Sequence, residues 1–598
     1  MRITHCGLFL ALFVAGCGDD SSSKDNDGGT VDGAVDAPTV TECNDGVDND
    51  GDGYTDWQYD LGCYGPADTT EAAGTRAEED GFTTFEIAGD SVAIYVASDG
   101  DDTRDGLTPA TAVRTLTRGA ALVRDGQHDF LLLRRGDTWR DQTLGRFKSG
   151  RDASHPLVIA SYGESVEMPL VEIGDHFIDH DGQARNHLAI IGLHFVVYRR
   201  AVGDPQFDGA GEGVFRFVGS GTNLLLEGNH LQFGEIVVQS CCADNSHYAN
   251  VEVRRNVIEK SYHRNTCLPG NPNGDSTFRP SGIYSSHVEG MLVEGNVFDH
   301  NGWNPEVPSA CATIYNHNVY LAATNDLVIR DNIFARASSI HIKLRSDETG
   351  AMDNTLIEGN YFVEGEIGVS VGGNSDQPAR FSNTTIRNNV LSDIGRSRPT
   401  TRTLAWGVEV IDNDTVSITD NYFLDQRESG VSNSYALQIA GGTERAVTVE
   451  RNLFYRIQST SLRSVSVAGH TNIRIAENTF ADPDQDSCLV THSGAFGQYT
   501  YANNRYFSSA DASRWFCAPG GRTSIENWRT TSGEANATAL TSLTFSDPDR
   551  TVEKYATTLG LAETLEAFLG AARGQQRLHW RNDLTAGAVN TYLRAGFE

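Results

Sequence analysis

The chain has 598 residues, and its 80 acidic side chains outnumber its 47 lysines and arginines, which gives a formal net charge of −33. Such acidity argues against nucleic acid or an anionic lipid surface as the general partner. Any acidic ligand would therefore need a local cluster of basic side chains. After the N-terminal segment, no stretch is apolar over the ~18 residues that a transmembrane helix requires.

Residues 1–16 read MRITHCGLFLALFVAG, with one arginine, a short apolar run and small residues at the end. This pattern predicts an export signal, because the apolar run is too short to span a membrane. VAGC at residues 14–17 resembles a bacterial lipobox. The resemblance implies cleavage before Cys17, lipidation of its thiol, and an exported lipoprotein anchored at the outer membrane or cell surface. The other interpretation is an ordinary secretory signal with a chance cysteine.

Residues 17–42 contain many acidic and small residues and few apolar ones, so we expect a disordered tether. Eight of the ten cysteines remain once Cys6 leaves with the signal and Cys17 carries the lipid. An oxidising compartment favours disulfides, and proximity pairs Cys43 with Cys63 and Cys488 with Cys517. The pairing of the middle four stays open; these are Cys241, Cys242, Cys267 and Cys311.

Residues 43–63 read CNDGVDNDGDGYTDWQYDLGC and form a small acidic module. Alternating oxygen ligands with a glycine at the turn suit Ca²⁺. The predicted ligands are Asp48, Asp50, Asp52, the Tyr54 carbonyl and Asp56. The glutamate that ends an EF-hand loop is missing, and Asp60 could replace it. The stretch resembles the acidic calcium repeats of thrombospondin type 3; the alternative is a hydrated acidic spacer closed by a disulfide, and residues 64–85 are expected to be a linker.

From about residue 180 the chain repeats a short apolar alternation followed by Asn, one residue, and an apolar or aromatic residue. A repeat of 26 to 40 residues with strand-like pieces predicts a solenoid of stacked strands. We expect the repeated asparagines to form a ladder, because Asn tolerates the left-handed backbone region and its amide can bond to the Asn of the next coil. The ladder consists of Asn229, Asn256, Asn296, Asn332, Asn360, Asn389, Asn421, Asn452, Asn478 and Asn504.

The repeat resembles the right-handed parallel β-helix of the pectate-lyase-like superfamily over about residues 85–545. The predicted fold is therefore all-β: a right-handed parallel β-helix with helical caps and a small N-terminal acidic calcium-binding module. The expected parts are an N-terminal cap with the first coils at 86–180, the parallel β-helix at 181–520, and a C-terminal segment with a helical cap at 521–598. An amphipathic stretch near 113–123 is expected to cap the first coil, and two helical patterns near 559–573 and 585–595 to cover the far side.

In this superfamily, the strand that follows the Asn turn borders the binding groove. With aliphatic residues inward, the outward positions of these strands are Gln239, Tyr284, Asn318, Tyr320, His341, Lys343, Arg345, Gly368, Ser370, Glu409, Gln438 and Ser466. The run SSIHIKLRSDE thus predicts an outward basic trio beside a glycine-bearing coil, which leaves room for a groove. The long loops Ser261–Ser281 and Asn301–Asn316 precede it and bring Trp303, a residue that could stack on a sugar or simply anchor its loop.

A basic trio suits β-elimination on a uronic-acid polysaccharide. Arg345 would neutralise the carboxylate, Lys343 or His341 would remove the adjacent proton, and Tyr320 or a histidine would protonate the leaving oxygen. Some β-helix polysaccharide lyases use a Lys–Arg pair with calcium assisting, so a second Ca²⁺ at the groove is one expectation of the resemblance. The expected substrate-binding residues are Tyr284, Asn318, Trp303 and Glu409.

Three functions stay open on the sequence. The first is a lyase of an acidic polysaccharide. The second is a non-catalytic, adhesive glycan-binding surface protein. The third is a glycoside hydrolase or epimerase, although Glu409 is the clearest outward carboxylate and a hydrolase needs two. We expect a monomer that binds no nucleic acid.

Overall fold

The computed structural model describes residues 40–598 apart from 72–75, 88, 241–246, 268–277, 347–349, 373–380, 443–444, 466–468 and 485. Thr41–Glu598 form one compact unit, to which the following description refers. The expected export signal, Cys17 and almost all of the tether lie outside the described residues, as do Cys241, Cys242 and Ser466. No described helix is long and apolar enough to cross a membrane.

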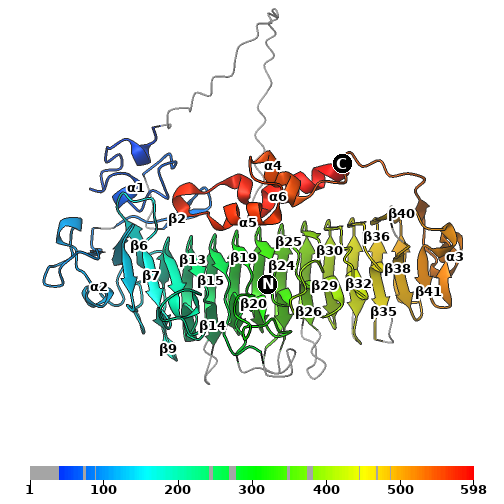
Figure 1. Cartoon of the computed structure of the whole chain (residues 1–598), viewed down its shortest axis with the longest axis horizontal. Coiled ribbons are helices and arrows are strands. Elements are labelled where there is room, and N and C mark those ends of the chain that lie inside the picture. Colours follow the sequence, from blue (N-terminus) through cyan, green and yellow to red (C-terminus); the bar gives the residue numbers. More distant parts are fainter. Residues whose placement is uncertain are drawn as a thin grey trace, which may run out of the picture. The chain divides into compact units, whose positions relative to one another are not determined.

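The body of the protein is a solenoid in which each coil contributes one strand to each of three parallel sheets (Figure 1). Each strand pairs with the equivalent strand one coil earlier and one coil later, so β20 pairs with β17 and β23. The first sheet consists of β3 (Ala93–Val96), β4 (Phe130–Arg134), β6 (Leu157–Tyr162), β10 (Leu188–Ile191), β12 (Phe215–Glu227), β15 (Tyr248–Arg254), β18 (Val288–Glu294), β21 (Asn325–Arg330), β24 (Met352–Glu358), β27 (Phe381–Arg387), β30 (Val416–Thr419), β33 (Val447–Glu450), β36 (Ile473–Ala476) and β39 (Tyr499–Ala502).

The second sheet has shorter strands, because the chain turns sharply before and after them. It consists of β5 (Thr138–Arg140), β7 (Leu170–Ile173), β11 (His194–Val197), β13 (His230–Gln232), β16 (Val257–Glu259), β19 (Val297–Asp299), β22 (Ile333–Ala335), β25 (Tyr361–Val363), β28 (Val390–Ser392), β31 (Tyr422–Leu424), β34 (Leu453–Tyr455), β37 (Thr479–Asp482), β40 (Arg505–Ser508) and β43 (Thr538–Ala539).

The third sheet carries the candidate site. Its strands are β8 (Ile178–Asp179), β9 (Gln183–Ala184), the first part of β12, β14 (Ile236–Ser240), β17 (Ile283–Ser286), β20 (His317–Ala322), β23 (Ile340–Arg345), β26 (Ile367–Gly372), β29 (Leu404–Ile411), β32 (Asn433–Ala440), β35 (Thr460–Val465), β38 (Cys488–Ser493), β41 (Phe516–Ala518) and β42 (Gly521–Thr523), the last of which is antiparallel to β41.

Stacked apolar side chains from the three sheets fill the interior of the solenoid. Phe298, Phe334 and Phe362 lie in successive coils, with ring centroids 4.9 and 5.1 Å apart and nearly parallel planes. Each coil alone leaves its inner face uncovered, and stacking buries these faces in one continuous core. The predicted parallel β-helix is confirmed as the architecture, and its coils begin at β3.

The ten predicted asparagines form a continuous ladder. The amide of each of the first nine donates to the side-chain oxygen of the next asparagine, as Asn332 does to Asn360 at 2.9 Å. The amide also donates to a strand carbonyl, so these buried turns leave few backbone groups unpaired. The left-handed conformation falls on the residue before each asparagine, such as Gly359 and Asn388, and not on the asparagine itself. The predicted ladder is therefore confirmed, but this part of its explanation is wrong.

Two short helices close the ends of the core. α2 (Leu116–Leu122) buries Leu116 and Gly119 against the first coils, where the amphipathic pattern predicted a cap. α3 (Ile525–Ser532) buries Trp528, whose ring stacks on Phe516 at 4.7 Å between centroids. The asparagine ladder ends just after this helix, because Asn504 donates to Glu534 at 2.8 Å.

Three further helices pack along the second sheet (Figure 1). They are α4 (Val552–Thr558), α5 (Leu565–Arg573) and α6 (Ala586–Arg594). The amide of Asn590 on α6 donates to the Gly359 carbonyl at 2.8 Å, and Arg573 on α5 pairs with the buried carboxylate of Asp299. These helices therefore cover a side of the solenoid, while α3 covers its end.

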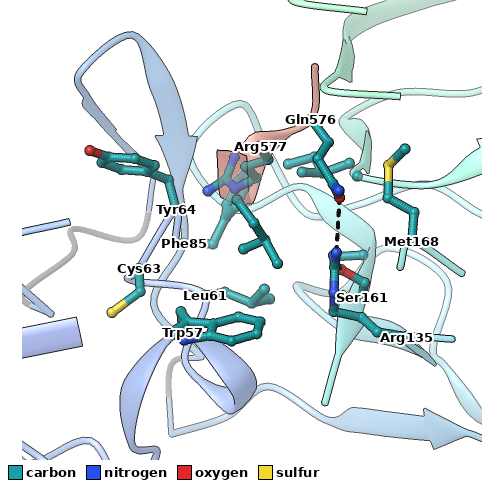
Figure 2. Close-up of a pocket in the computed structure, with 14 residues that line it drawn as sticks. Trp57, Leu61, Cys63, Tyr64, Phe85, Arg135, Ser161, Met168, Gln576 and Arg577 are labelled. Carbon is teal, nitrogen blue, oxygen red and sulfur yellow. Dashed lines mark hydrogen bonds between the residues drawn. The ribbon is translucent and has the colours of Figure 1, made fainter. Parts of the chain in front are cut away.

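The acidic module, containing α1 (Asp56–Tyr59), is followed by the antiparallel hairpin of β1 (Ala77–Glu79) and β2 (Phe82–Thr84). The later part of the segment expected to be a linker is thus a packed hairpin, in which the Thr83 N–H donates to the buried Glu227. A cavity of about 30 Å³, the size of one water molecule, lies between the module, the first coils and the C-terminal segment. Figure 2 shows Arg135 donating to Gln576 across it, at 3.0 Å.

Candidate functional site

One row of side chains runs along the outside of the third sheet, because the parallel register repeats in every coil. We name it the outer row: Asp179, Arg216, Val237, Tyr284, Tyr320, Lys343, Ser370, Glu409, Gln438, Arg463, Thr491 and Cys517. Their strands can be followed in Figure 1 from β14 through β20, β26, β29, β32 and β35 to β41. Ile342 and Leu344 point the other way and are fully buried in the core, as the alternation predicted.

His341 does not belong to this outer face, so its predicted outward orientation is wrong. Its side chain is fully buried and packs near the core rings of Phe334 and Phe362. One ring nitrogen contacts the Asn318 amide at 2.9 Å and the other lies 3.1 Å from the Glu364 carbonyl oxygen. Burial lowers the pKa of His341 to about 4, so the ring is neutral at pH 7 and is held as part of the structure.

The physical reason is a local break in the strand alternation. Ile340 lies in an outer apolar cluster with Ile367, whereas Ile342 lies in the core, and only His341 stands between them. Two consecutive residues therefore face inward, as at a β-bulge. The same break buries Asn318, so its predicted contact with substrate is also wrong. It also leaves no space for a side chain at Gly368, because an added Cβ there would lie 2.4 Å from the Gly407 carbonyl oxygen.

Lys343 is half-buried at the middle of the outer row. Its amine donates to Ser370 Oγ at 3.2 Å and to the Gly372 carbonyl. Burial lowers the pKa of Lys343 to about 8; the charge of Glu409 opposes this shift and that of Arg345 adds to it. About one lysine in ten is then neutral at pH 7. A neutral amine can keep both donated hydrogen bonds and still present a lone pair to the outside.

Arg345 lies on β23, the strand of Lys343, and pairs with Tyr320 on the neighbouring coil. Arg345 Nη1 donates to Tyr320 Oη at 3.3 Å, and the Tyr284 ring lies 5.6 Å from that of Tyr320. Because the tyrosine oxygen already accepts this bond, its own hydroxyl proton can be directed outward. The arrangement places a cation, a phenol and an aromatic ring along adjacent positions of one face.

The histidine of this face is His317, which the sequence reasoning missed. Its ring packs edge-on against Tyr320, with centroids 5.3 Å apart. Burial lowers the pKa of His317 to about 3, and the charges of Lys343, Arg402 and Arg279 act in the same direction. No signal for it was present in the sequence, because strict alternation turns Asn318 outward and its neighbour His317 inward.

Glu409 lies two coils beyond Lys343 and is held by three donors. Tyr435 and Gln438 donate to one of its oxygens, each at 3.1 Å, and Ser370 donates to the other at 3.3 Å. Ser370 thus links Lys343 to Glu409. Burial and the Glu409 carboxylate raise the pKa of Tyr435, so this phenol stays protonated as a donor. Trp406 stacks on Tyr435 at 5.1 Å and extends the face with an aromatic surface.

The two long loops lie beside His317. A disulfide between Cys267 and Cys311 joins them, and the Arg279 guanidinium lies 4.4 Å from the centre of the Tyr315 ring. Cys43 pairs with Cys63 and Cys488 with Cys517, the same pairs that proximity suggested. The loops therefore border the outer row near Tyr320, against which His317 packs.

Trp303 has a structural position in its loop. Its indole N–H donates to the Arg336 carbonyl at 3.1 Å, and its ring lies 5.2 Å from that of His300. Arg336 pairs in turn with Asp299 on the second sheet, which helix α5 covers. Of the two interpretations of Trp303, these contacts favour the loop anchor, and no described contact brings it to Lys343.

A cleft of about 570 Å³ opens on the same face at the C-terminal coils. Its lining includes Thr460, Arg463 and Thr491, together with the Cys488–Cys517 disulfide. The cleft is not centred on Lys343: Arg463 follows Lys343 by four strand pairings along the outer row.

The acidic module gathers carboxylates that could hold a metal ion. The oxygens of Asp48, Asp50 and Asp52 lie within 4.8 Å of one another. Asp56, a predicted ligand, instead accepts the Gly46 N–H at 3.1 Å with both oxygens, which closes the loop. Burial and, in smaller part, neighbouring acidic groups raise the pKa of Asp52 to about 6.

A second pair of carboxylates, Asp60 and Glu71, lies beneath this triad. One oxygen of Asp60 is buried with no hydrogen-bond partner among the described residues, and Glu71 is fully buried. Burial raises the pKa of Asp60 to about 8, and the charges of Asp52, Asp50 and Glu71 add to the shift. A buried carboxylate with one unpartnered oxygen, beside three others, fits a divalent cation, whose charge would relieve the repulsion. Sequence spacing suggested Asp60 but missed Glu71, which lies outside the loop.

Residues 319–527 match the family model described as "Right handed beta helix region". The solenoid is a right-handed β-helix. This match covers less than half of the chain, and a comparison with curated proteins gives no match.

Among solved structures, the chain is similar to a GH136 lacto-N-biosidase from Eubacterium ramulus, with 13% identity, coverage of 75% of this chain and 67% of that one, and a TM-score of 0.33. It is also similar to a mannuronic acid specific polysaccharide family 6 lyase from human gut microbiota, with 14% identity, coverage of 76% of this chain and 92% of that one, and a TM-score of 0.36. A third similar structure is the A-module of the Azotobacter vinelandii mannuronan C-5 epimerase AlgE4, with 11% identity, coverage of 69% of this chain and 89% of that one, and a TM-score of 0.33. At these identities and scores the likeness concerns the fold alone.

Proposed function

We propose that this chain is a polysaccharide lyase that cleaves an acidic, uronic-acid glycan by β-elimination on the outer row of its β-helix. The observation that carries the proposal is the half-buried Lys343, whose pKa is lowered to about 8, next to the Arg345–Tyr320 pair. A base with a pKa near the working pH, a carboxylate-binding cation and a proton donor are the three groups that this reaction needs.

Each group has a defined role in the reaction. Arg345 binds the uronate carboxylate, which stabilises the negative charge that develops when the adjacent carbon loses its proton. The neutral amine of Lys343 takes that proton. The electron pair forms a carbon–carbon double bond, the bond to the glycosidic oxygen breaks, and Tyr320 donates its proton to that oxygen. Glu409, fixed by Ser370, Tyr435 and Gln438, accepts hydrogen bonds from sugar hydroxyls.

The carboxylates of this face support elimination over hydrolysis. A glycosidase needs two carboxyl groups on either side of the bond that it cleaves. Within the described part of the outer row, from Tyr284 to Cys517, Glu409 is the one carboxylate, and three protein groups already donate to it.

The test is to incubate the protein with a panel of uronic-acid polymers and to measure the ultraviolet absorbance of the products. Elimination leaves a conjugated double bond in the product, and this bond absorbs. The proposal requires this absorbance to rise on at least one acidic polymer. Release of reducing ends without absorbance would replace the lyase by a hydrolase, a change of sugar configuration without cleavage would indicate an epimerase, and binding without either would indicate an adhesive protein.

Calcium at the acidic module belongs to the same proposal. Asp48, Asp50, Asp52 and Asp60 would supply oxygen ligands, with Glu71 behind them, and the ion would brace the module against the first coils. The raised pKa values of Asp52 and Asp60 mean that both carboxyls keep protons toward neutral pH, and the metal has to displace these protons.

We therefore expect the calcium affinity of the full chain to increase as the pH rises through about 6 and again through about 8. Titration calorimetry at successive pH values measures this. The double substitution Asp48→Asn and Asp52→Asn should remove the binding heat and the calcium-dependent rise in melting temperature. Glu164→Gln, at an exposed acidic residue outside the module, is the control. An affinity that is independent of pH, or unchanged in the double variant, would contradict the site.

The cellular location is proposed from residues 1–17. Cleavage before Cys17 would produce a lipid-modified N-terminus followed by an acidic segment. In a bacterial host we expect Cys17→Ala to move the protein from the membrane fraction to the soluble fraction, as measured by fractionation and labelling with a fatty acid. If the wild-type chain takes up no fatty-acid label, lipidation is refuted and residues 1–16 are an ordinary secretory signal.

A further inference from the structure

The cleft at the C-terminal coils contains a cation of the outer row that has no described ionic partner. Arg463 is half-buried on β35 and lines the cleft, and it makes no ion pair with any residue in the described part of the chain. The Arg463 side chain also makes no hydrogen bond to a described residue, so its guanidinium donors are not used within the described part of the chain. Its unused donors are suited to a planar anion that comes from outside.

The charged side chains that line the cleft carry a net positive charge. Arg522 lines it and shares the single carboxylate of Asp486 with Arg514. The lining of the cleft thus contains two guanidinium groups, of Arg463 and Arg522, and one carboxylate, of Asp486. The neutral hydroxyls of Thr460 and Thr491 bond to each other at 2.8 Å and add hydrogen-bonding groups beside the cations.

The cleft and Lys343 lie on the same row. Four consecutive parallel pairings connect Lys343 through Ser370, Glu409 and Gln438 to Arg463. At about 4.8 Å for each step between strands, the two cations are about 19 Å apart along the solenoid axis. A single sugar cannot span this separation, whereas several linked sugars can.

We propose that Arg463 and its cleft form a distal subsite that binds a second carboxylate of the same glycan chain whose reacting sugar lies at Lys343. This inference rests on the proposed function. The substrate is then an extended acidic polymer that lies across the coils, parallel to the solenoid axis. Its hydroxyls meet Glu409 and Gln438 between the two cationic positions, and the ring of Trp406 lies beside them.

The distal subsite predicts a loss that depends on substrate length. We expect Arg463→Gln to lower kcat/KM about tenfold on the polymer, the usual size of one lost charge-assisted hydrogen bond, but less than twofold on a trisaccharide that cannot reach the cleft. Arg445→Gln is the matched control, because Arg445 is exposed away from the outer row and is 3.8 Å from its partner Asp414. Thermal melting checks that each variant is folded.

Binding is measured separately by affinity electrophoresis in gels that contain the polymer or its carboxyl-reduced form. Weaker retention of Arg463→Gln by the polymer, and equal retention by the reduced form, supports the subsite. Equal losses on trisaccharide and polymer, or no loss on either, would overturn it. If the wild type binds the polymer through Arg463 but forms no unsaturated product, the proposed lyase reaction fails while the distal subsite stands.

Discussion

Replacing Lys343 by alanine should lower the rate of β-elimination by about 10²- to 10⁴-fold, the range expected when a general base is removed. The reason is that Lys343 is the one described basic side chain of the outer row whose pKa is lowered toward neutrality, to about 8. The measurement is the initial rate of ultraviolet absorbance on the most active polymer. Arg345→Ala should produce a loss of similar size by leaving the substrate carboxylate unneutralised.

The pH dependence separates a base from a mere binding cation. A base acts in its neutral form, so the wild-type rate should increase with pH and level off above about 8. Lys343→Arg keeps the charge but cannot lose its proton, and should be as slow as Lys343→Ala at every pH. Arg387→Ala on β27 is the control, because it removes an exposed cation from the first sheet. Turnover retained in both Lys343→Ala and Arg345→Ala would refute the mechanism.

The second large effect concerns stability, and we expect Asn360→Ala to lower the free energy of unfolding by about 3 kcal/mol. The side-chain oxygen of Asn360 accepts from the backbone N–H and the amide of Asn332, and its own amide donates to Ile329 and Asn389. Alanine would leave buried donors and acceptors unpaired on both neighbouring coils. Denaturant unfolding monitored by circular dichroism measures the difference.

An exposed asparagine provides the comparison. Asn527 lies on the solvent side of α3, and Asn527→Ala should change stability by less than about 0.5 kcal/mol. A similar small change for Asn360→Ala would mean that water replaces the lost bonds, and the ladder would then not be a major source of stability.

The β-helix could be predicted from the sequence because its signal repeats. Ten asparagines with similar apolar neighbours specify the turns and the stacking, and the same short sequence pattern recurs in each of these coils. The lateral position of α4, α5 and α6 could not be predicted, because it depends on contacts such as Arg573 with Asp299, which are 274 residues apart.

The site was predicted in part. Alternation placed Tyr320, Lys343, Ser370 and Glu409 correctly on one face, because the strands are regular there. It failed at His341, where a single irregular residue exchanges the inner and outer sides. Strand periodicity cannot reveal such a break, because a histidine is compatible with either side. The exchange became visible only through the packing of His341 near Phe334 and Phe362.

The C-terminal segment also has a consequence for the order of folding. Arg577 bonds to Glu227 across 350 residues of sequence, and Arg594 bonds to the carbonyl of Asn389 across 205. The coils themselves can form by successive local additions, each on the coil before it. The contacts of the last helices can form only after the chain is almost complete, and their long separations make them slow to close. Until then the side chains of the second sheet, from Val257 to Ala481, stay open to water and to other chains. The protein therefore passes through a stage in which its scaffold is built but its apolar flank is uncovered, and shortening its C-terminus would prolong that vulnerable stage.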